Sequence, residues 1–207
     1  MLVFIDIHKQ KLLASTIFKS FLDYYYFVNG ITMSGSFMDK MSQLVKFISH
    51  THTPTEAVLA DFLKRLNFEV EDLLPWKSDV SKENSIDKKY IHQDRYFEIM
   101  LVTWHLQAST RIQLHKNVDW GALQVFGHVL FSSYKVDTRL NIKRLKEKKL
   151  NDKALIHLKS QQYHQIRNIG HEDLLVLQIL GCDKKPVEHS TEQFFSVKNR
   201  LISFSKS

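Results

Sequence analysis

Apolar residues recur at helical spacing in two segments of the N-terminal third of the chain. Beyond Asp39, one helical face would carry Met41, Leu44, Val45 and Ile48. The second stripe consists of Val58, Leu59, Phe62, Leu63 and Leu66. Ahead of it, the run Thr53-Pro54-Thr55-Glu56 predicts Thr53 as the N-cap, Pro54 at the first helical position and Glu56 completing a capping box. Because two helices alone cannot bury both stripes, we expect them to cover a larger unit.

After Tyr90 the period of the apolar positions changes from helical to alternating. The runs that follow are short and rich in β-branched and aromatic residues, and they cover residues 96–105, 110–115, 120–126, 128–136, 154–158, 163–168 and 173–180. Seven strands at this spacing predict a small antiparallel barrel or jelly roll. A last run, 201–205, could close an edge of it. The fold class is therefore predicted to be mainly β with an N-terminal helical cover.

The same patterns divide the chain into three parts. Residues 1–37 have irregular periodicity and are predicted to be an N-terminal extension without an assigned function. One alternative is that translation begins later, since Met33, Met38 and Met41 follow closely. Residues 38–89 hold the helical cover and a polar linker, and residues 90–207 hold the β-barrel.

Composition excludes several classes of protein. The chain has 207 residues, of which 43% are hydrophobic and 25% charged, with six Gly and three Pro, as in one folded domain and unlike a fibre or a disordered tail. The single cysteine, Cys182, cannot form an internal disulfide and suits a reducing compartment, so we expect a cytoplasmic protein. No run approaches the roughly 18 apolar residues of a membrane span, and we expect no membrane partner.

The formal charge of +7 is concentrated in one stretch of the chain. Between Arg139 and Lys149 there are six basic residues and one acidic residue, Glu147. Nucleic-acid contact is compatible with this charge, but no aromatic residues are interleaved for base stacking. We therefore expect a solvated loop or short exposed helix and no nucleic-acid partner.

Polar residues occur where a strand would alternate between the interior and the surface. Residues i and i+2 share a face, so Arg111, Gln113 and His115 should point the same way. If this set faces inward, its polar atoms need partners, and a metal ion is one way to supply them. His164 and Gln178 occupy similar places in later strands. The alternative, that these groups are solvated at the surface, stays open.

The other histidines and the cysteine suggest no chemistry of their own. His105 and His128 stand at strand ends, and most of these side chains are expected to be solvated. Cys182 is assigned no role.

The motifs around these residues resemble those of the cysteine dioxygenase group of cupins, the thiol dioxygenases. The family's first motif is a strand ending in Trp, a short gap, Ile-His-x-His and two spaced glycines. Its counterpart here is Trp104, Ile112-Gln113-Leu114-His115, Trp120-Gly121 and Gly127. The second motif, His-x-Val-x-Asn followed by Ser-Leu-His-x-Tyr, is similar to residues 164–168 and 176–180. The resemblance covers residues 39–205 and implies a cupin-type jelly-roll barrel with eroded active-site motifs.

The resemblance also implies a metal site and a reaction. The family binds Fe(II) through three neutral imidazoles, and the matching positions hold Gln113, His115 and His164. An amide oxygen is a weaker donor than imidazole, so a weak or metal-shifted site is expected. The implied partners are a small thiol and O₂, which would occupy the open positions of a non-haem iron.

The groups that act on the substrate depart further from the family. Its Ser-His-Tyr relay is replaced by Val176, Gln178 and Leu180, so Gln178 is the remaining polar candidate there. The family's carboxylate-binding Arg falls near His92, and Arg111 is a possible substitute. Two functions follow: an iron-dependent thiol dioxygenase, which is an oxidoreductase, or a catalytically degenerate cupin acting as a ligand-binding or interaction module. Different metal chemistry, such as isomerisation, is a third alternative.

Overall fold

The computed structural model describes residues 35–78, 85–115, 118–137, 141–159 and 162–181, together with the backbone of 192–195 and 201–202. The chain divides into two compact units, residues 1–75 and 76–207. Cys182, residues 1–34 of the predicted extension and Arg139 of the basic stretch lie outside the described residues.

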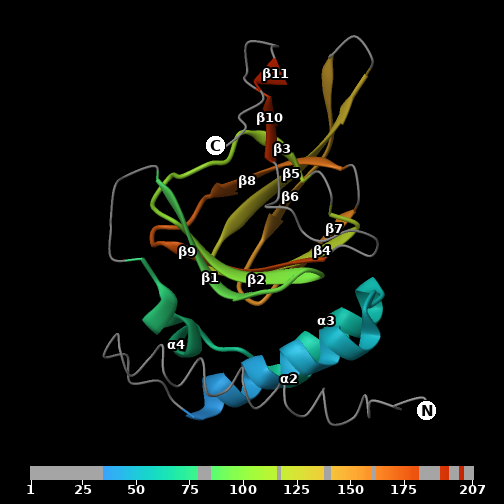
Figure 1. The fold of residues 1–207 in the computed structure, drawn as a ribbon. Coiled ribbons are helices and arrows are strands. Elements are labelled where there is room, and N and C mark those ends of the chain that lie inside the picture. Colours follow the sequence, from blue (N-terminus) through green and yellow to red (C-terminus); the bar gives the residue numbers. More distant parts are fainter. Residues whose placement is uncertain are drawn as a thin grey trace, which may run out of the picture. The chain divides into compact units, whose positions relative to one another are not determined.

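The described residues of the first unit form the helices α2 (Gly35–Thr51), α3 (Glu56–Leu66) and the short α4 (Val70–Leu73), and a 3-10 turn follows at Leu74–Trp76 (Figure 1). The rings of Phe47 and Phe62 stack with centroids 4.0 Å apart, which joins α2 to α3. Lys40 Nζ donates to Asp72 Oδ2 at 2.6 Å and to the Asn67 carbonyl at 3.0 Å. An aromatic stack and a part-buried ion pair therefore hold the three helices together.

Both predicted helices are confirmed, but the predicted cap of the second is wrong. Thr55, and not Thr53, is the N-cap, and its side chain accepts a hydrogen bond from the Val58 N–H at 3.4 Å. Thr55 is extended, with φ −65° and ψ 157°, and so Pro54 stays outside the helix. Thr55 supplies the same cap chemistry with Glu56 in the first turn, where a carboxylate is favourable.

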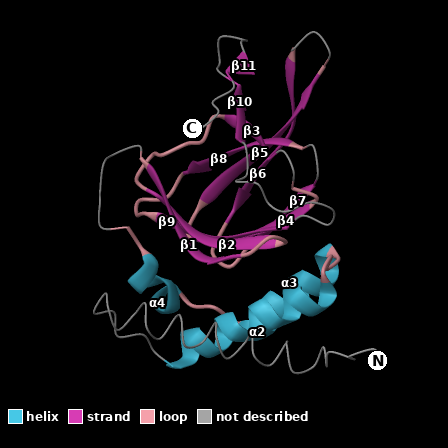
Figure 2. Cartoon of the chain, in the orientation of Figure 1, coloured by secondary structure: helices cyan, strands magenta, loops and turns pink. Residues whose placement is uncertain are grey.

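The second unit consists of antiparallel strands in two sheets (Figure 2). One sheet has the order β1-β2-β9-β4-β7 and the other β11-β10-β3-β8-β5-β6. The strands are β1 (Ile86–Gln93), β2 (Phe97–Trp104), β3 (Ile112–His115), β4 (Trp120–Phe126), β5 (Val129–Val136), β6 (Ile142–Leu150), β7 (Leu155–Lys159), β8 (Tyr163–Asn168), β9 (Leu174–Gly181), β10 (Glu192–Phe195) and β11 (Leu201–Ile202). This arrangement confirms the prediction of a mainly β fold with helices at the N-terminal end.

Residues from both sheets meet in one hydrophobic core. Its members are Met100, Val102, Trp104, Ala108, Val118, Leu123, Val125, Val129, Ile156, Leu158, Ile166, Leu174, Val176 and Leu180. In an antiparallel pair, directly opposite residues share a face. The register together with this core therefore identifies the inward-facing side chains of every strand that contributes to it.

Two strands depart from the predictions. β1 begins at Ile86, inside the segment predicted to be a polar linker. The basic stretch, predicted to be a loop or short helix, forms β6 instead. Both lie at or next to sheet edges, where a strand needs no buried face and so shows no clean alternation.

None of the described helices has the length and apolar character needed to cross a membrane.

Candidate functional site

Two histidines lie side by side on the inward face of the second sheet. His164 of β8 is opposite Gln113 of β3 in the register, and His115 lies two residues further along β3. Ile166, two residues after His164, belongs to the core, so His164 faces inward. The exposed fractions are 5% for Gln113, 7% for His115 and 1% for His164. We call Gln113, His115 and His164 the inward cluster.

The rings of the inward cluster are stacked. The centroids of His115 and His164 are 5.1 Å apart with an interplanar angle of 28°. Phe131 of β5 stacks near His164 as well, at 5.8 Å and 24°. The imidazoles are therefore held in place by packing on rigid strands, as a binding site requires.

The hydrogen bonds of His164 fix its proton. Its Nδ1 lies 3.2 Å from the carbonyl oxygen of Gln162, which can only accept, so Nδ1 is the donor. Its Nε2 lies 3.2 Å from the amide nitrogen of Gln113, which donates to it. The ring is therefore assigned as neutral, with the Nε2 lone pair directed at Gln113. A backbone carbonyl on one nitrogen is the usual way to orient the other toward a metal.

His115 is buried without comparable partners. Within the described ranges, neither of its ring nitrogens has a hydrogen-bond partner. Burial lowers the pKa of His115 to about 4, and the positive charge of Lys88 on β1 contributes to the lowering. The ring is therefore neutral at pH 7, which is the form that binds metal ions. A buried donor and acceptor left unsatisfied cost free energy, which an added ligand would recover.

The opposite sheet adds two inward polar groups. Gln178 of β9 pairs with Met100 and Leu123, both core residues, and is 4% exposed. Its amide nitrogen has no hydrogen-bond partner among the described residues. Glu98 of β2 is opposite Leu180 and fully buried. Sequence reasoning missed Glu98, although a lone carboxylate inside the apolar run 97–104 was a signal.

The donor set of the inward cluster fits a metal ion only in part. In the described residues, no three His, Cys, Asp or Glu side chains could jointly hold a metal ion. The available donors are two imidazoles and the amide of Gln113. The Gln113 amide nitrogen donates a hydrogen bond to the His164 Nε2 lone pair. Metal ligation therefore requires the Gln113 amide to rotate and present its oxygen. Two imidazoles and one carbonyl oxygen suit a weakly held divalent transition metal.

The two other predicted substrate residues are not brought to the inward cluster. His92 is opposite Ile99 in the register, on the face away from the core, and its Nε2 lies 3.3 Å from Asp94 Oδ2. Arg111 precedes β3 and is exposed. The structure therefore joins Gln113, His115 and His164, places Gln178 on the inward face of the other sheet, leaves His92 on the face away from the core, and exposes Arg111.

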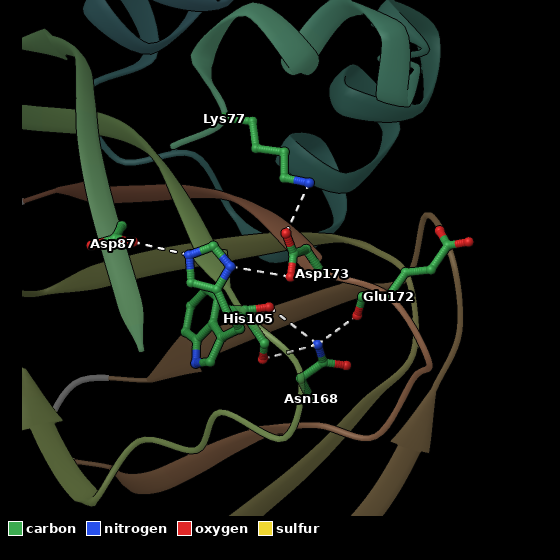
Figure 3. A network of polar contacts seen from close by, with 7 residues as sticks. Lys77, Asp87, His105, Asn168, Glu172 and Asp173 are labelled. Carbon is green, nitrogen blue, oxygen red and sulfur yellow. Dashed lines mark hydrogen bonds and ion pairs between the residues drawn. The ribbon is translucent and has the colours of Figure 1, made fainter. Parts of the chain in front are cut away.

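A second buried polar assembly lies at the strand ends (Figure 3). Asn168, at the end of β8, donates from its amide to the carbonyls of Trp104 at 3.1 Å, His105 at 3.3 Å and Glu172 at 2.7 Å. Its side-chain oxygen accepts from the Gly170 N–H at 2.9 Å. Asn168 therefore ties the ends of β2 and β8 to the turn that leads into β9.

His105 continues this assembly and corrects the expectation that it is solvated. It is 3% exposed, with Nε2 3.0 Å from Asp87 and Nδ1 3.1 Å from Asp173. Lys77 Nζ lies 2.8 Å from the other oxygen of Asp173. Burial raises the pKa of Asp173, but the hydrogen bonds and charges of Lys77 and His105 outweigh it, and the pKa lies below its usual value. We call Lys77, Asp87, His105, Asn168 and Asp173 the strand-end network.

Comparisons with known proteins give likenesses of fold alone. No protein-family model matches the chain, and a search of curated proteins found no match. Among solved structures, the Cnp3 cupin domain of Schizosaccharomyces pombe is 11% identical with a TM-score of 0.40, over 51% of this chain and 70% of that one. An oxalate oxidase is 10% identical with a TM-score of 0.41, over 51% of this chain and 55% of that one.

A cupin superfamily protein from Desulfitobacterium hafniense is 16% identical to this chain. The match has a TM-score of 0.39 and covers 64% of this chain and 96% of that one. None of these three proteins is described as a thiol dioxygenase.

Proposed function

We propose that the inward cluster binds a divalent transition metal, with Fe(II) the ion that the thiol dioxygenase resemblance implies. The observation that carries the proposal is the pair of buried, neutral, stacked imidazoles on neighbouring strands. His115 has no hydrogen-bond partner on either nitrogen within the described residues. A metal ion supplies the electron-pair acceptor that a buried neutral imidazole lacks.

The proposed reaction is the addition of O₂ to the sulfur of a small thiol. Bound iron would supply open positions for the thiol and O₂. Within the chain, the Gln162 carbonyl keeps the proton of His164 on Nδ1, and the Gln113 amide would rotate away from His164 to present its oxygen to the ion. The unused amide donor of Gln178 is the candidate for orienting the substrate. Because His92 faces away from the core and Arg111 is exposed, we propose a thiol without a carboxylate clamp.

Metal content per chain tests the proposal. Protein made in iron-supplemented medium is compared with His115→Ala/His164→Ala and with His50→Ala/His128→Ala, which removes two exposed histidines. We expect iron in the wild type and the control and none in the cluster variant. Oxygen uptake with a panel of small thiols should occur in the wild type and the control, which contain iron, and not in the cluster variant. Equal iron in the cluster variant would refute the assignment of the site.

A second candidate function is a non-catalytic cupin that binds a ligand or partner. The observation that favours it is the composition of β9, where Val176 and Leu180 belong to the apolar core. Neither side chain can transfer a proton, and Gln178 between them cannot do so at neutral pH. Iron binding without oxygen uptake for any thiol would favour this function. Thiol-dependent oxygen uptake by the wild type alone would exclude it.

A further inference from the structure

β6 is the outermost strand of the second sheet and the most exposed one with described side chains. It ends the order β11-β10-β3-β8-β5-β6, and in the described part of the chain it pairs with β5 alone (Figure 1). All seven residues from Lys143 to Lys149 are exposed, and only Ile142 and Leu150 are partly covered. Half of the backbone N–H and C=O groups of such a strand point away from its partner.

The side chains of β6 carry a strong positive charge on both faces. Five of its nine residues are basic, and the one acid, Glu147, is paired with Arg144 and accepts from the Ser132 hydroxyl at 3.2 Å. Lys148 is opposite Phe131 and shares the inward face. Lys149, opposite Leu130, lies on the other face.

A β-bulge at Leu145 divides this edge. The register with β5 shifts between Lys146 and Arg144, which leaves Leu145 as the extra residue, 59% exposed. The longer regular stretch, Lys146–Leu150, holds three lysines and Glu147. We call Lys146–Leu150 the basic edge.

The charge of the basic edge restricts what can pair with it. A second copy of β6 in antiparallel pairing would place cationic strands against each other, and like charges directly opposite are destabilising. Lysine on an edge strand therefore protects this sheet against self-association. A partner strand with acidic side chains would meet attraction at the same positions.

We propose that the basic edge docks an extended acidic polypeptide segment, which adds as a further strand next to β6. The outward backbone groups match a polypeptide strand, which donates and accepts along its length. The lysines on both faces match a strand too, because its side chains also alternate between faces. A nucleic acid fits less well, since β6 has no aromatic side chain for base stacking.

Binding of a fluorescent, end-blocked peptide of alternating Glu and Thr tests the proposal. It is compared with the same peptide N-methylated at alternate residues, which keeps the charge but blocks strand pairing, and with an oligothymidylate of equal charge. The protein variants are Lys146→Glu/Lys148→Glu and the matched control Lys46→Glu/Lys64→Glu, which reverses two exposed charges in the helices. Thermal unfolding confirms that each variant is folded.

We expect the Kd for the acidic peptide to rise about tenfold or more in the basic-edge variant and to stay unchanged in the control. N-methylation of the peptide should raise its Kd for the wild-type protein by a similar factor, because it blocks strand pairing. Raised salt should also weaken binding of the unmodified peptide. Equal binding of the N-methylated peptide, equal affinity of the basic-edge variant, or tighter binding of the oligothymidylate would each overturn the proposal. No binding of the acidic peptide would overturn it as well.

Discussion

The inward cluster and the strand-end network each bury a histidine to a similar degree, but the hydrogen-bond partners of the two histidine rings differ. His105 is 3% exposed and His115 is 7% exposed. Both nitrogens of His105 face carboxylate oxygens, whereas those of His115 face no hydrogen-bond partner among the described residues. Burial alone therefore does not distinguish these two histidines, whereas the partners of their ring nitrogens do.

Strand β8 contributes one residue to each of these two sites. β8 carries His164 and, four residues later, Asn168, and both lie on its inward face. Asn168 joins the end of β8 to the carbonyls of Trp104, His105 and Glu172, whereas His164 lies near the start of the strand. The network stabilises the fold, and within the cluster His115 retains a lone pair that no described hydrogen bond uses.

The largest expected effect concerns the strand-end network. Asn168→Leu removes an amide donor from three carbonyls, of which that of His105 keeps the Ala108 N–H, and it removes the acceptor of the Gly170 N–H. It should lower the free energy of unfolding by about 3 kcal/mol. Asn141→Leu removes a single exposed side-chain hydrogen bond, to Asp137 at 2.9 Å, and should lower it by no more than about 1 kcal/mol. Urea unfolding measures both. If both variants lost the same small amount of unfolding free energy, the strand-end network would not hold the strand ends together.

The next effect is a dependence of stability on pH that arises from His115. Because the pKa of His115 is lowered from 6.5 to about 4 in the folded state, the unfolded state takes up the proton first. Stability is therefore full above pH 6.5 and declines as the pH falls toward about 4, by about 3 kcal/mol in total.

His115→Leu should remove this decline in metal-free protein while changing the stability at pH 7 little. Urea unfolding at a series of pH values, with wild type and variant in chelator, measures the difference. Curves that run parallel from pH 7 to pH 4 would mean that His115 does not titrate as its burial requires.

A third change sharpens the assignment of the ligand set. Gln113→His replaces the weak amide donor with imidazole beside His115 and His164, and it should tighten Fe(II) binding by about tenfold or more. Gln43→His, at an exposed position of α2, is the control and should leave the affinity unchanged. Isothermal titration calorimetry under anaerobic conditions measures the Kd for Fe(II) in both variants. Unchanged affinity in the cluster variant would exclude residue 113 from the ligand set.

Sequence reasoning found the elements whose apolar pattern follows a buried face. Both long helices and all seven predicted strands are present because each buries one face or both. β6 was missed because an exposed edge strand has no alternation to read. His105 was taken as solvated because its partners, Asp87 and Asp173, lie far away in the sequence. The predicted ligand residues meet because Gln113 and His164 are opposite each other on neighbouring strands.

The smallest expected effect concerns His92, which has a partner of its own outside the inward cluster. Burial raises the pKa of Asp94, but hydrogen bonds from His92 and from the Tyr96 and Phe97 N–H groups outweigh it, and the pKa lies below its usual value. In His92→Ala the two backbone bonds remain but the contact with the Phe97 ring is lost, so the stability at pH 7 should fall by about 1 kcal/mol.

Iron content and thiol-dependent oxygen uptake should stay at the wild-type level in His92→Ala, because the side chain lies on the face away from the core. Arg111→Ala, at an exposed position before β3, should behave in the same way. Elemental analysis and an oxygen electrode measure both variants. If either variant lost oxygen uptake while retaining iron, that residue would reach the substrate, and the inward cluster would then extend beyond Gln113, His115 and His164.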